Sequence, residues 1–327
     1  MKTIGVLTSG GDAPGMNAAI RAVVRTACEN QIKVYGIDRG FQGLMEGKEN
    51  LIPMEIRTVC DIIHRGGTVL HSARSKEFTT EEGMQKAIET CKAYGIEGIV
   101  VIGGDGSFRG ARDLSERGIP CVGIPGTIDN DIACCDYTIG YDTCMNTIME
   151  MVDRVRDTSA SHDRCSVIEV MGRRAGYLAL NAGIAVGATA ILIPEVEFDL
   201  KRDVFDRIRR TQRTGKKHFL IIVAEGIPAD GIISVDELAK AIQKETGVES
   251  RAMVLAHVQR GGTPTVRDRV VASQMGYHAV NLLLQGIGNR VVAMQKDDIV
   301  DFDIFEALNM KKHIDMELYK MANMISI

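Results

Sequence analysis

The 327-residue sequence lacks the segments that would place a protein in a membrane or on a nucleic acid. No uninterrupted apolar segment approaches the ~18 residues that suggest a transmembrane helix. The apolar stretch inside the N-terminal MKTIGVLTSGG is too short for a secretory signal. The sequence has no long basic run and a net charge of −4, which disfavours a nucleic-acid or anionic-membrane surface. We therefore expect a cytoplasmic protein whose arginines serve more specific purposes.

The chain also lacks CxxC pairs, low-complexity segments and flexible linkers. Its eight cysteines are scattered: Cys28, Cys60, Cys91, Cys121, Cys134, Cys135, Cys144 and Cys165. This distribution is typical of free thiols in a cytosolic protein rather than of a disulfide or zinc framework. The vicinal Cys134 and Cys135 allow two interpretations, an oxidant-sensitive pair or ordinary buried thiols.

What the sequence does contain is an alternation of short apolar runs with helix-length amphipathic segments. Its composition, 45% hydrophobic and 25% charged, is ordinary for a globular protein with a sizeable core, and its length allows one large or two medium domains. The strand-like runs cover residues 3–8, 97–102, 119–124, 166–171, 189–193 and 218–223. Because these β-branched runs show little polar alternation, they predict an α/β protein with parallel, doubly wound sheets.

The clearest predicted helices cover residues 16–29, 108–117, 141–158, 234–245 and 267–285. In the third, Met145, Ile148, Val152 and Val155 form a stripe that should face the core. Gly140 separates this helix from a polar loop, so we expect a domain boundary near residue 140. RGGT occurs at 65–68 and again at 260–263, but four residues do not establish a repeat.

Polar clusters follow the strand-like runs. They are SGGD (9–12), GGDGS (103–107), PGTIDND (125–131), EVMGRR (169–174), AEG (224–226) and HVQRGG (257–262). In open α/β sheets, ligands bind beyond the carboxyl ends of the strands, so the six clusters could surround one cleft. Together they predict an enzyme or binding protein with an extensive polar site.

Two of these clusters suit phosphate groups. LTSGGDAPGMN places glycines at a strand-to-helix turn, where backbone N–H groups can meet an anion. A plain tight turn without a phosphate contact is the alternative interpretation. In IGGDGSFRGA, Asp105 lies between glycines, where its carboxylate would repel a phosphate unless a cation intervened. Mg²⁺ would resolve that conflict, and the other interpretation makes Asp105 a helix N-cap.

Basic residues recur near the other clusters. They are Arg74, Arg164, Arg173, Arg174, Arg251, His257 and Arg260. Arginine can bridge phosphate oxygens with a fixed fork of donors, so arginines gathered in an acidic protein favour a phosphorylated small molecule over a polymer. Any one of them, taken alone, could equally be a solvated surface residue.

The segment IPGTIDNDI (124–132) places two carboxylates behind a Pro-Gly turn. If the chain were extended, Asp129 and Asp131 would lie on the same side, about 6–7 Å apart. One carboxylate could accept a hydroxyl proton while the other orients a sugar, and Thr127 could contact the substrate or a transferred phosphoryl group. The alternative is an Asx-turn with both acids solvated.

The motifs LTSGGDAPGMNAAIR, VVIGGDGS, PGTIDNDI, VMGRRAG and HVQRGG, in this order and spacing, resemble the bacterial ATP-dependent 6-phosphofructokinase family. The resemblance runs from Lys2 to at least Asp303. It implies a glycolytic kinase that transfers the γ-phosphoryl group of ATP to the C1 hydroxyl of fructose 6-phosphate. It also implies two α/β domains of similar size, each with a mainly parallel sheet flanked by helices. Residues 1–140 plus about 259–309 would bind ATP, and about 141–258 plus 310–327 would bind fructose 6-phosphate.

The resemblance also implies roles, motif by motif. The catalytic residues would be Gly11, Arg74, Thr127, Asp129 as general base, and Arg173. The ATP site would include Gly11, Arg74, Ser75, Gly104, Asp105, Gly106 and Ser107, with Asp105 as the Mg²⁺ ligand. The sugar-phosphate site would include Thr127, Asp129, Asp131, Arg164, Met171, Gly172, Arg173, Glu225, Arg251, His257 and Arg260. Arg164 and Arg251 would reach the sugar phosphate of a neighbouring subunit, which implies a homotetramer with shared sites.

Two glycines favour ATP as the donor. Pyrophosphate-using relatives typically carry Asp at the position of Gly106 and Lys at that of Gly126. An Asp at the first position would crowd and repel a nucleotide, whereas glycine leaves room.

The resemblance extends to an effector site for ADP or phosphoenolpyruvate. The matching residues are Arg21, Arg25, Arg156, Gly187, Lys216 and His218. Three usual residues are replaced: an arginine by Ile56, with Arg57 next to it, a glutamate by Thr189 and a lysine by Thr214. Because these changes remove phosphate and magnesium contacts, we expect weakened or altered allosteric control.

Three alternatives stay open from the sequence: a pyrophosphate-dependent phosphofructokinase, a different kinase with a GGDG motif, such as an NAD or lipid kinase, and a non-catalytic sugar-phosphate sensor. Arg74, Asp105 and Asp129 are all present, which speaks against the sensor.

Overall fold

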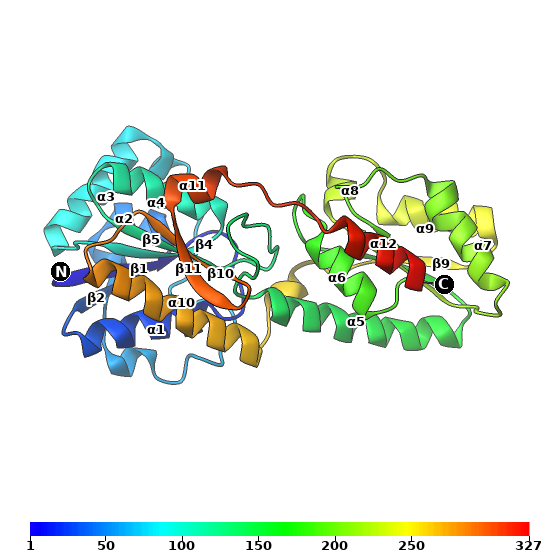
Figure 1. The fold of residues 1–327 in the computed structure, drawn as a ribbon, viewed down its shortest axis with the longest axis horizontal. Coiled ribbons are helices and arrows are strands. Elements are labelled where there is room, and N and C mark those ends of the chain that lie inside the picture. Colours follow the sequence, from blue (N-terminus) through cyan, green and yellow to red (C-terminus); the bar gives the residue numbers. More distant parts are fainter. Residues whose placement is uncertain (327) are drawn as a thin grey trace. The chain divides into compact units, whose positions relative to one another are not determined.

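The computed structural model describes residues 1–326, which form two compact units (Figure 1). Unit 1 comprises Met1–Ile128, Ile132–Thr143 and Arg260–Lys312. Unit 2 comprises Asp129–Asp131, Cys144–Gln259 and the chain from His313 onward. Each unit is therefore assembled from separate stretches of chain. Residue 327, the last residue of the predicted sugar-phosphate domain, lies outside the described residues.

Unit 1 is built on a seven-stranded sheet with the order β11-β10-β5-β4-β1-β2-β3. The strands are β1 (Thr3–Thr8), β2 (Lys33–Ile37), β3 (Leu51–Met54), β4 (Ile99–Gly103), β5 (Cys121–Pro125), β10 (Arg290–Gln295) and β11 (Asp298–Asp303). The five inner strands are parallel, and the two edge strands pair antiparallel. β4 and β5 are buried along their whole length, as expected for strands covered on both faces.

Helices flank this sheet, and α1 packs along α10 (Figure 1). The helices of unit 1 are α1 (Met16–Glu29), α2 (Gly40–Glu46), α3 (Glu81–Tyr94), α4 (Asp105–Glu116), α10 (Val266–Leu284) and α11 (Ile304–Asn309). The α1–α10 contact is close because Gly276 faces α1: a Cβ added there would lie 2.7 Å from Ala22 Cβ. Residues far apart in the chain thus form one layer.

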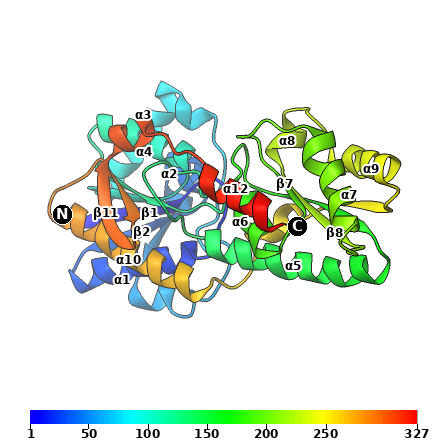
Figure 2. The same ribbon diagram turned by 45° about the vertical axis from the view of Figure 1, so that its right-hand side comes forward.

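Unit 2 has a four-stranded, fully parallel sheet with the order β7-β8-β6-β9. Its strands are β6 (Cys165–Val170), β7 (Ala190–Leu192), β8 (Phe219–Ala224) and β9 (Ser250–Val254). Its helices are α6 (Tyr177–Ala185), α7 (Asp206–Gln212), α8 (Gly226–Ala229), α9 (Val235–Thr246) and α12 (Met316–Ile325). The chain enters unit 2 within α5 (Tyr141–Ser161), and α12 packs beside α6 (Figure 2).

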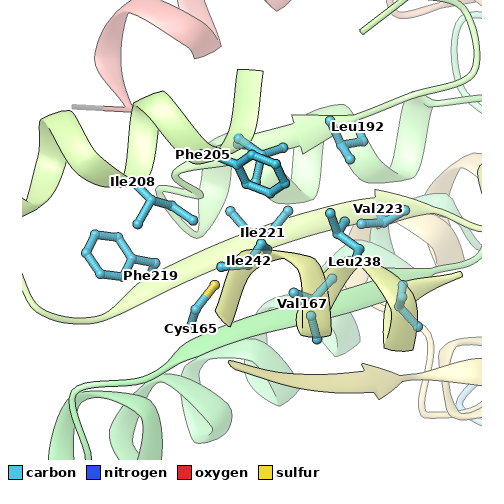
Figure 3. Packing of buried hydrophobic residues seen from close by; sticks show 14 of the residues in the cluster. Cys165, Val167, Leu192, Phe205, Ile208, Phe219, Ile221, Val223, Leu238 and Ile242 are labelled. Atoms are coloured by element: carbon cyan, nitrogen blue, oxygen red, sulfur yellow. The ribbon is translucent and has the colours of Figure 1, made fainter. Parts of the chain in front are cut away.

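An apolar cluster on one face of this sheet joins it to its helices (Figure 3). Phe219 and Ile221 of β8 pack with Ile208 of α7 and with Leu238 and Ile242 of α9. All five side chains are fully buried. The cluster holds β8 in place, and β8 in turn positions the polar residues that follow it.

The predicted α/β class, with two mainly parallel sheets flanked by helices, is confirmed. The sheets differ in size, seven strands against four. Among the described residues, no helix has both the length and the apolar character needed to cross a membrane.

Candidate active site

In unit 1, the turns after β1 and β4 meet where the strand order reverses. β1 lies between β2 and β4, and the crevice at such a switch point is the usual ligand site of an open α/β sheet. A Cβ added to Gly103 would lie 2.4 Å from the carbonyl oxygen of Ser9, so the two turns are in direct contact. The predicted phosphate clusters therefore share one place in the fold.

The glycine turn after β1 exposes its backbone. Gly10 (φ +87°) and Gly15 (φ +108°) adopt the left-handed conformation that glycine tolerates best. The N–H of Met16 donates to the carbonyl of Ala13 (3.2 Å), but no side chain caps α1, so the next N–H groups of its first turn can meet an anion. Arg260 Nη1 donates to the carbonyl of Asp12 (3.2 Å), and a Cβ on Gly11 would lie 2.5 Å from that nitrogen. The structure thus brings the predicted residues Gly11 and Arg260 together.

The turn after β4 offers open space beside a carboxylate. A Cβ added to Gly104 or Gly106 would meet no atom within 4 Å. The N-cap interpretation of Asp105 is wrong, because Gly104 occupies the N-cap and Asp105 is the first helical residue of α4. Ser107, by contrast, is buried against the glycine turn.

This carboxylate fits Mg²⁺ as a ligand. Among residues 1–326, no three Asp, Glu, His or Cys side chains gather into a protein-only metal site. Mg²⁺ needs only one or two carboxylates when phosphate oxygens and water complete its shell. Asp105, half-buried next to open space, meets that requirement.

Gly106 and Gly126 differ in their surroundings. Gly106 faces open space, but a Cβ on Gly126 would lie 3.1 Å from Ile102 Cγ2 and from Met16 Cε. Of these two glycines, only Gly106 therefore has open space beside it. At Gly126, a larger residue would have to displace core side chains.

The two RGGT segments lie against each other. A Cβ on Gly66 would lie 2.4 Å from the carbonyl oxygen of Gly262. Arg74, a few residues after the first segment, is exposed, and Ser75 Oγ accepts a hydrogen bond from the N–H of Phe78 (3.1 Å). Gly66 permits this close approach of the two backbones.

The IDND segment forms a turn rather than the extended chain on which the 6–7 Å separation was based. Ile128 and Asp129 lie in the turn, and Asn130 has φ +52°. Thr127 and Asp129 are buried, so the interpretation with both acids solvated is wrong for Asp129. Contacts assign Ile128 to unit 1 and Asp129–Asp131 to unit 2.

Unit 2 has a pocket of about 910 Å³ at the carboxyl ends of β6 and β8. Its lining residues are Asp131, Glu169, Arg173, Arg174, Ala175, Glu225, Pro228 and Ala229. β6 lies between β8 and β9, so this pocket also occupies a switch point. Acids and arginines from several segments can therefore act on one ligand.

A carboxylate shapes the turn after β6. Gly172 (φ +136°) and Arg173 (φ +55°) are both left-handed, and both donate their N–H groups to Glu225 Oε1, at 3.1 and 2.5 Å. Just before them, the N–H of Met171 donates to Oε1 of the fully buried Gln259 (3.1 Å). Glu225 thus holds the conformation that aims Arg173 into the pocket.

Two residues of this region were not singled out from the sequence, Glu169 and Gln259. Arg174, which was named as a candidate phosphate ligand, lines the pocket. Burial, followed by the charge of Glu225, raises the pKa of Glu169. The available signal was a lone acid inside the apolar run SVIEVM. His257, which was predicted, is exposed in the short helix Ala256–Arg260.

Arg164 and Arg251 lie at the other end of the sheet of unit 2. They flank the amino ends of β6 and β9, while the pocket lies at the carboxyl ends, about 20 Å away along a six-residue strand. Both contact Glu249, at 3.0 and 2.6 Å, and Arg164 is the main cause of the lowered pKa of that acid. The structure therefore does not bring these two arginines to the pocket of their own chain.

The predicted effector residues fall into two groups. Arg21 and Arg25 lie on α1 in unit 1. In unit 2, Arg156 donates to the carbonyl of Val186, beside Gly187. Lys216 and His218 are close enough to Arg156 for its charge to lower both pKa values, although burial is the larger cause. The group in unit 2 is a cluster of cations that an anion would stabilise.

Cys134 and Cys135 are buried in unit 1. Burial raises the pKa of both thiols, that of Cys134 to about 12. Because the thiolate is the reactive form, this environment favours ordinary buried thiols over an oxidant-sensitive pair.

The two switch-point sites define an α/β protein with places for anionic ligands in both units. The family model described as "Phosphofructokinase" matches residues 3–283. The chain is 55% identical over its full length to the ATP-dependent 6-phosphofructokinase of Clostridioides difficile and 53% identical to that of Bacillus subtilis, with 100% of each chain covered. The chain belongs to the phosphofructokinase family.

Solved structures agree with this assignment. The chain is similar to the phosphofructokinase of Saccharomyces cerevisiae, with a TM-score of 0.89 and 34% identity over 100% of this chain and 48% of that one. A pyrophosphate-dependent phosphofructokinase from Marinobacter aquaeolei has a TM-score of 0.85 at 24% identity, covering 97% of this chain and 86% of that one. At that identity, the likeness shows the fold alone.

Proposed function

We propose that the protein is a glycolytic, cytoplasmic kinase that transfers the γ-phosphoryl group of ATP to the C1 hydroxyl of fructose 6-phosphate, giving fructose 1,6-bisphosphate and ADP. The observation that carries this proposal is the full-length identity of 53–55% to proteins named ATP-dependent 6-phosphofructokinase. The two switch-point sites support it, because one suits phosphate groups and the other an anionic ligand held by arginines and acids.

Phosphoryl transfer depends on alignment and charge neutralisation more than on covalent help. The backbone amides at Gly11 would meet the phosphates, and Arg74 would neutralise charge on the transferred group. Asp129 would accept the proton of the C1 hydroxyl, a role worth about 10²–10⁴-fold in rate. Mg²⁺, when bound, would supply Lewis-acid charge neutralisation at the phosphates, with Asp105 as its protein ligand.

Fructose 6-phosphate would bind in the pocket of unit 2, whose volume of about 910 Å³ suits a small ligand. Asp131, Arg173 and Glu225 line this pocket and would hold the hydroxyl and phosphate groups. Met171, Gly172 and His257 are the further residues of unit 2 proposed to contact the sugar phosphate. Thr127 and Arg260, which belong to unit 1, are proposed as sugar-phosphate ligands from the family resemblance alone.

A coupled assay with fructose 6-phosphate, Mg²⁺ and either ATP or pyrophosphate tests the proposal. The open space at Gly106 supports ATP as the donor. Turnover with pyrophosphate but not with ATP would contradict the assignment of ATP as the phosphoryl donor. Binding of fructose 6-phosphate without turnover would favour the sensor alternative.

The position of Arg164 and Arg251, away from their own pocket, supports a homotetramer in which they reach the sugar phosphate of a neighbouring subunit. Mixing an Arg164→Ala variant with an Asp129→Ser variant tests this arrangement. Each variant alone should be nearly inactive, whereas mixed oligomers should regain activity at sites that combine an intact Asp129 with an intact Arg164. Absence of any recovery after subunit exchange contradicts shared sites.

The cations of unit 2 support an effector site for ADP or phosphoenolpyruvate, with control weaker than or different from the family pattern. Thr189 is fully buried and Ile56 is a half-exposed apolar residue, so neither supplies the charge it replaces. Saturation curves for fructose 6-phosphate with each effector test this, and strong conventional responses to both would contradict it.

A further inference from the structure

A buried carboxylate in unit 1 is not part of the proposed reaction. Asp268 is the third residue of α10, and its side chain is fully buried. Its Oδ1 accepts hydrogen bonds from Tyr137 Oη (2.6 Å) and from the N–H of Gly140 (2.7 Å). Its Oδ2 accepts from the N–H (2.9 Å) and Oγ1 (2.5 Å) of Thr143. Four donors from one segment, residues 137–143, thus converge on a single carboxylate. We call this segment the 137–143 loop, and its last three residues form the first turn of α5.

The same loop holds Thr127. The N–H of Ile139 donates to the carbonyl of Pro125 (3.0 Å), and the N–H of Thr127 donates to the carbonyl of Ile139 (3.1 Å). Thr138 Oγ1 donates to the carbonyl of Thr127 (2.7 Å). The loop therefore lies beside the end of β5 like a short extra strand, with Thr127 bonded to it on both sides.

The loop also packs on the glycine turn after β1. A Cβ on Gly140 (φ +101°) would lie 2.6 Å from Ala13 Cβ. A Cβ on Gly15 would lie 2.6 Å from Ile139 Cγ2 and 3.4 Å from Asp268 Cβ. A displacement of the loop would consequently move both the turn and Thr127.

We propose that Asp268 is a positioning residue: its carboxylate fixes the 137–143 loop and, through it, Thr127 and the glycine turn. This inference rests on the proposed function, in which Thr127 meets the reacting groups. The competing explanation is that Asp268 contributes to stability alone. The two explanations predict different kinetics, because only in the positioning role does the effect of Asp268 on kcat depend on Thr127.

Asp268→Asn is the informative variant. Each carboxylate oxygen accepts one hydroxyl and one backbone N–H, so an amide group facing either side leaves one N–H, of Gly140 or Thr143, without its acceptor. The hydroxyls can turn to adapt, but the backbone cannot. Asp301→Asn is the matched control, since Asp301 is held by Arg290 (2.5 Å) and His278 (3.0 Å) in the same unit and has no bond to the loop.

A double-mutant cycle with Thr127→Val tests the path to turnover. In the otherwise wild-type chain, Asp268→Asn should lower kcat about 10- to 100-fold, the range that a small misplacement near the reacting atoms can cause. In the Thr127→Val background, the same change should lower kcat by a clearly smaller factor, because the route through Thr127 is lost and only the route through the glycine turn remains. The KM for fructose 6-phosphate should change little in Asp268→Asn. The Asp301→Asn control should leave both kcat and KM nearly unchanged. Equal losses in both backgrounds would overturn the proposal.

Hydrogen exchange gives a readout that does not depend on activity. Asp268→Asn should speed exchange of the Thr127 and Ile139 amides at least about tenfold through local opening, and Asp301→Asn should not. Unchanged exchange at both amides overturns the inference even if the enzyme is active. Absence of turnover in the wild type overturns the proposed function instead, while exchange still decides the structural link. If Asp268→Asn does not fold, Thr143→Val replaces it, with Thr143→Ser expected to restore the wild-type behaviour.

Discussion

The two units hold their candidate ligand residues by different means. In unit 1, closely packed glycines and the buried Asp268 fix the backbone around the phosphate turns. In unit 2, charged side chains line an open pocket, and Glu225 alone bonds both N–H groups of the turn that carries Arg173. Packed backbone tolerates few changes, whereas side-chain charge can be altered without loss of the fold. Substitutions in unit 1 should therefore affect turnover and stability, and those of the pocket-lining residues of unit 2 should affect sugar-phosphate binding.

Asp129 tests this comparison most severely, because contacts place it in unit 2 although it is buried. We expect Asp129→Ser to lower kcat by about 10²–10⁴-fold or more, the contribution of a positioned base. Binding of fructose 6-phosphate, measured by calorimetry, should stay comparatively intact. Near-normal turnover would contradict the assignment of Asp129 as the general base. Loss of binding with unchanged kcat would instead assign Asp129 a role in binding, like that of the pocket-lining residues.

Two adjacent glycines test the packing of unit 1. Gly103→Ala would put a Cβ 2.4 Å from a backbone carbonyl and should lower the free energy of unfolding by about 1–3 kcal/mol. In Gly104→Ala the added Cβ would lie in open space, so the free energy of unfolding should change by less than about 0.5 kcal/mol. Urea unfolding of both variants measures the difference. Equal effects would mean that the contact between the two turns is not rigid.

Glu225→Gln tests the charge-based design of unit 2. The amide oxygen can still accept an N–H, but the charge is lost, so KM for fructose 6-phosphate should rise about tenfold while kcat falls less than about threefold. Thermal unfolding should be nearly unchanged. Glu197→Gln, an exposed acid of the same unit, is the control. A kcat loss larger than the KM effect would contradict the division of roles.

The cation cluster of unit 2 predicts a smaller, pH-dependent effect. Burial, then Lys216 and Arg156, lower the pKa of His218, so its contribution to stability is present above its ordinary value of 6.5 and is lost as pH falls through the lowered folded value. A bound anion offsets the repulsion from Lys216 and Arg156 and raises the pKa of His218, so the imidazole takes up a proton when the anion binds. Sulfate, whose charge does not change in this pH range, should therefore bind about threefold more tightly near pH 6 than near pH 8. Calorimetry should show this change reduced in His218→Gln, and an undiminished change would exclude His218 as the titrating group.

The sequence predicted the elements with the strongest local pattern. The buried strands β1, β4, β5, β6 and β8 and the long helices α1, α5 and α10 appear near their predicted positions. Two edge strands of unit 1 were not predicted: β3 contains Pro53, and β11 mixes acids with apolar residues, as half-exposed edges do. Position in the sheet does not explain every case, because the edge strand β7 was predicted at 189–193 whereas the inner strands β2 and β10 were missed.

For the site, composition and spacing located the motifs but not their contacts. Gly11 and Arg260 are 249 positions apart, and nothing local shows that the arginine occupies the space that glycine leaves. The turn at Asn130 and the partners of Asp268 depend in the same way on tertiary packing. A residue whose task is to hold another segment has no sequence signature of its own.

The interrupted make-up of unit 1 has a consequence for synthesis on the ribosome. β5 gains its neighbour β10, and the 137–143 loop gains Asp268, only after the whole stretch Cys144–Gln259 has been translated. At ordinary translation rates that interval lasts roughly ten seconds, during which an apolar strand edge stays open on the nascent chain. Unit 2 has most of its residues in one continuous stretch and can complete its sheet first. The sheet of the unit proposed to handle ATP is thus completed after the sheet of unit 2, and premature termination before β10 would release a chain prone to aggregate.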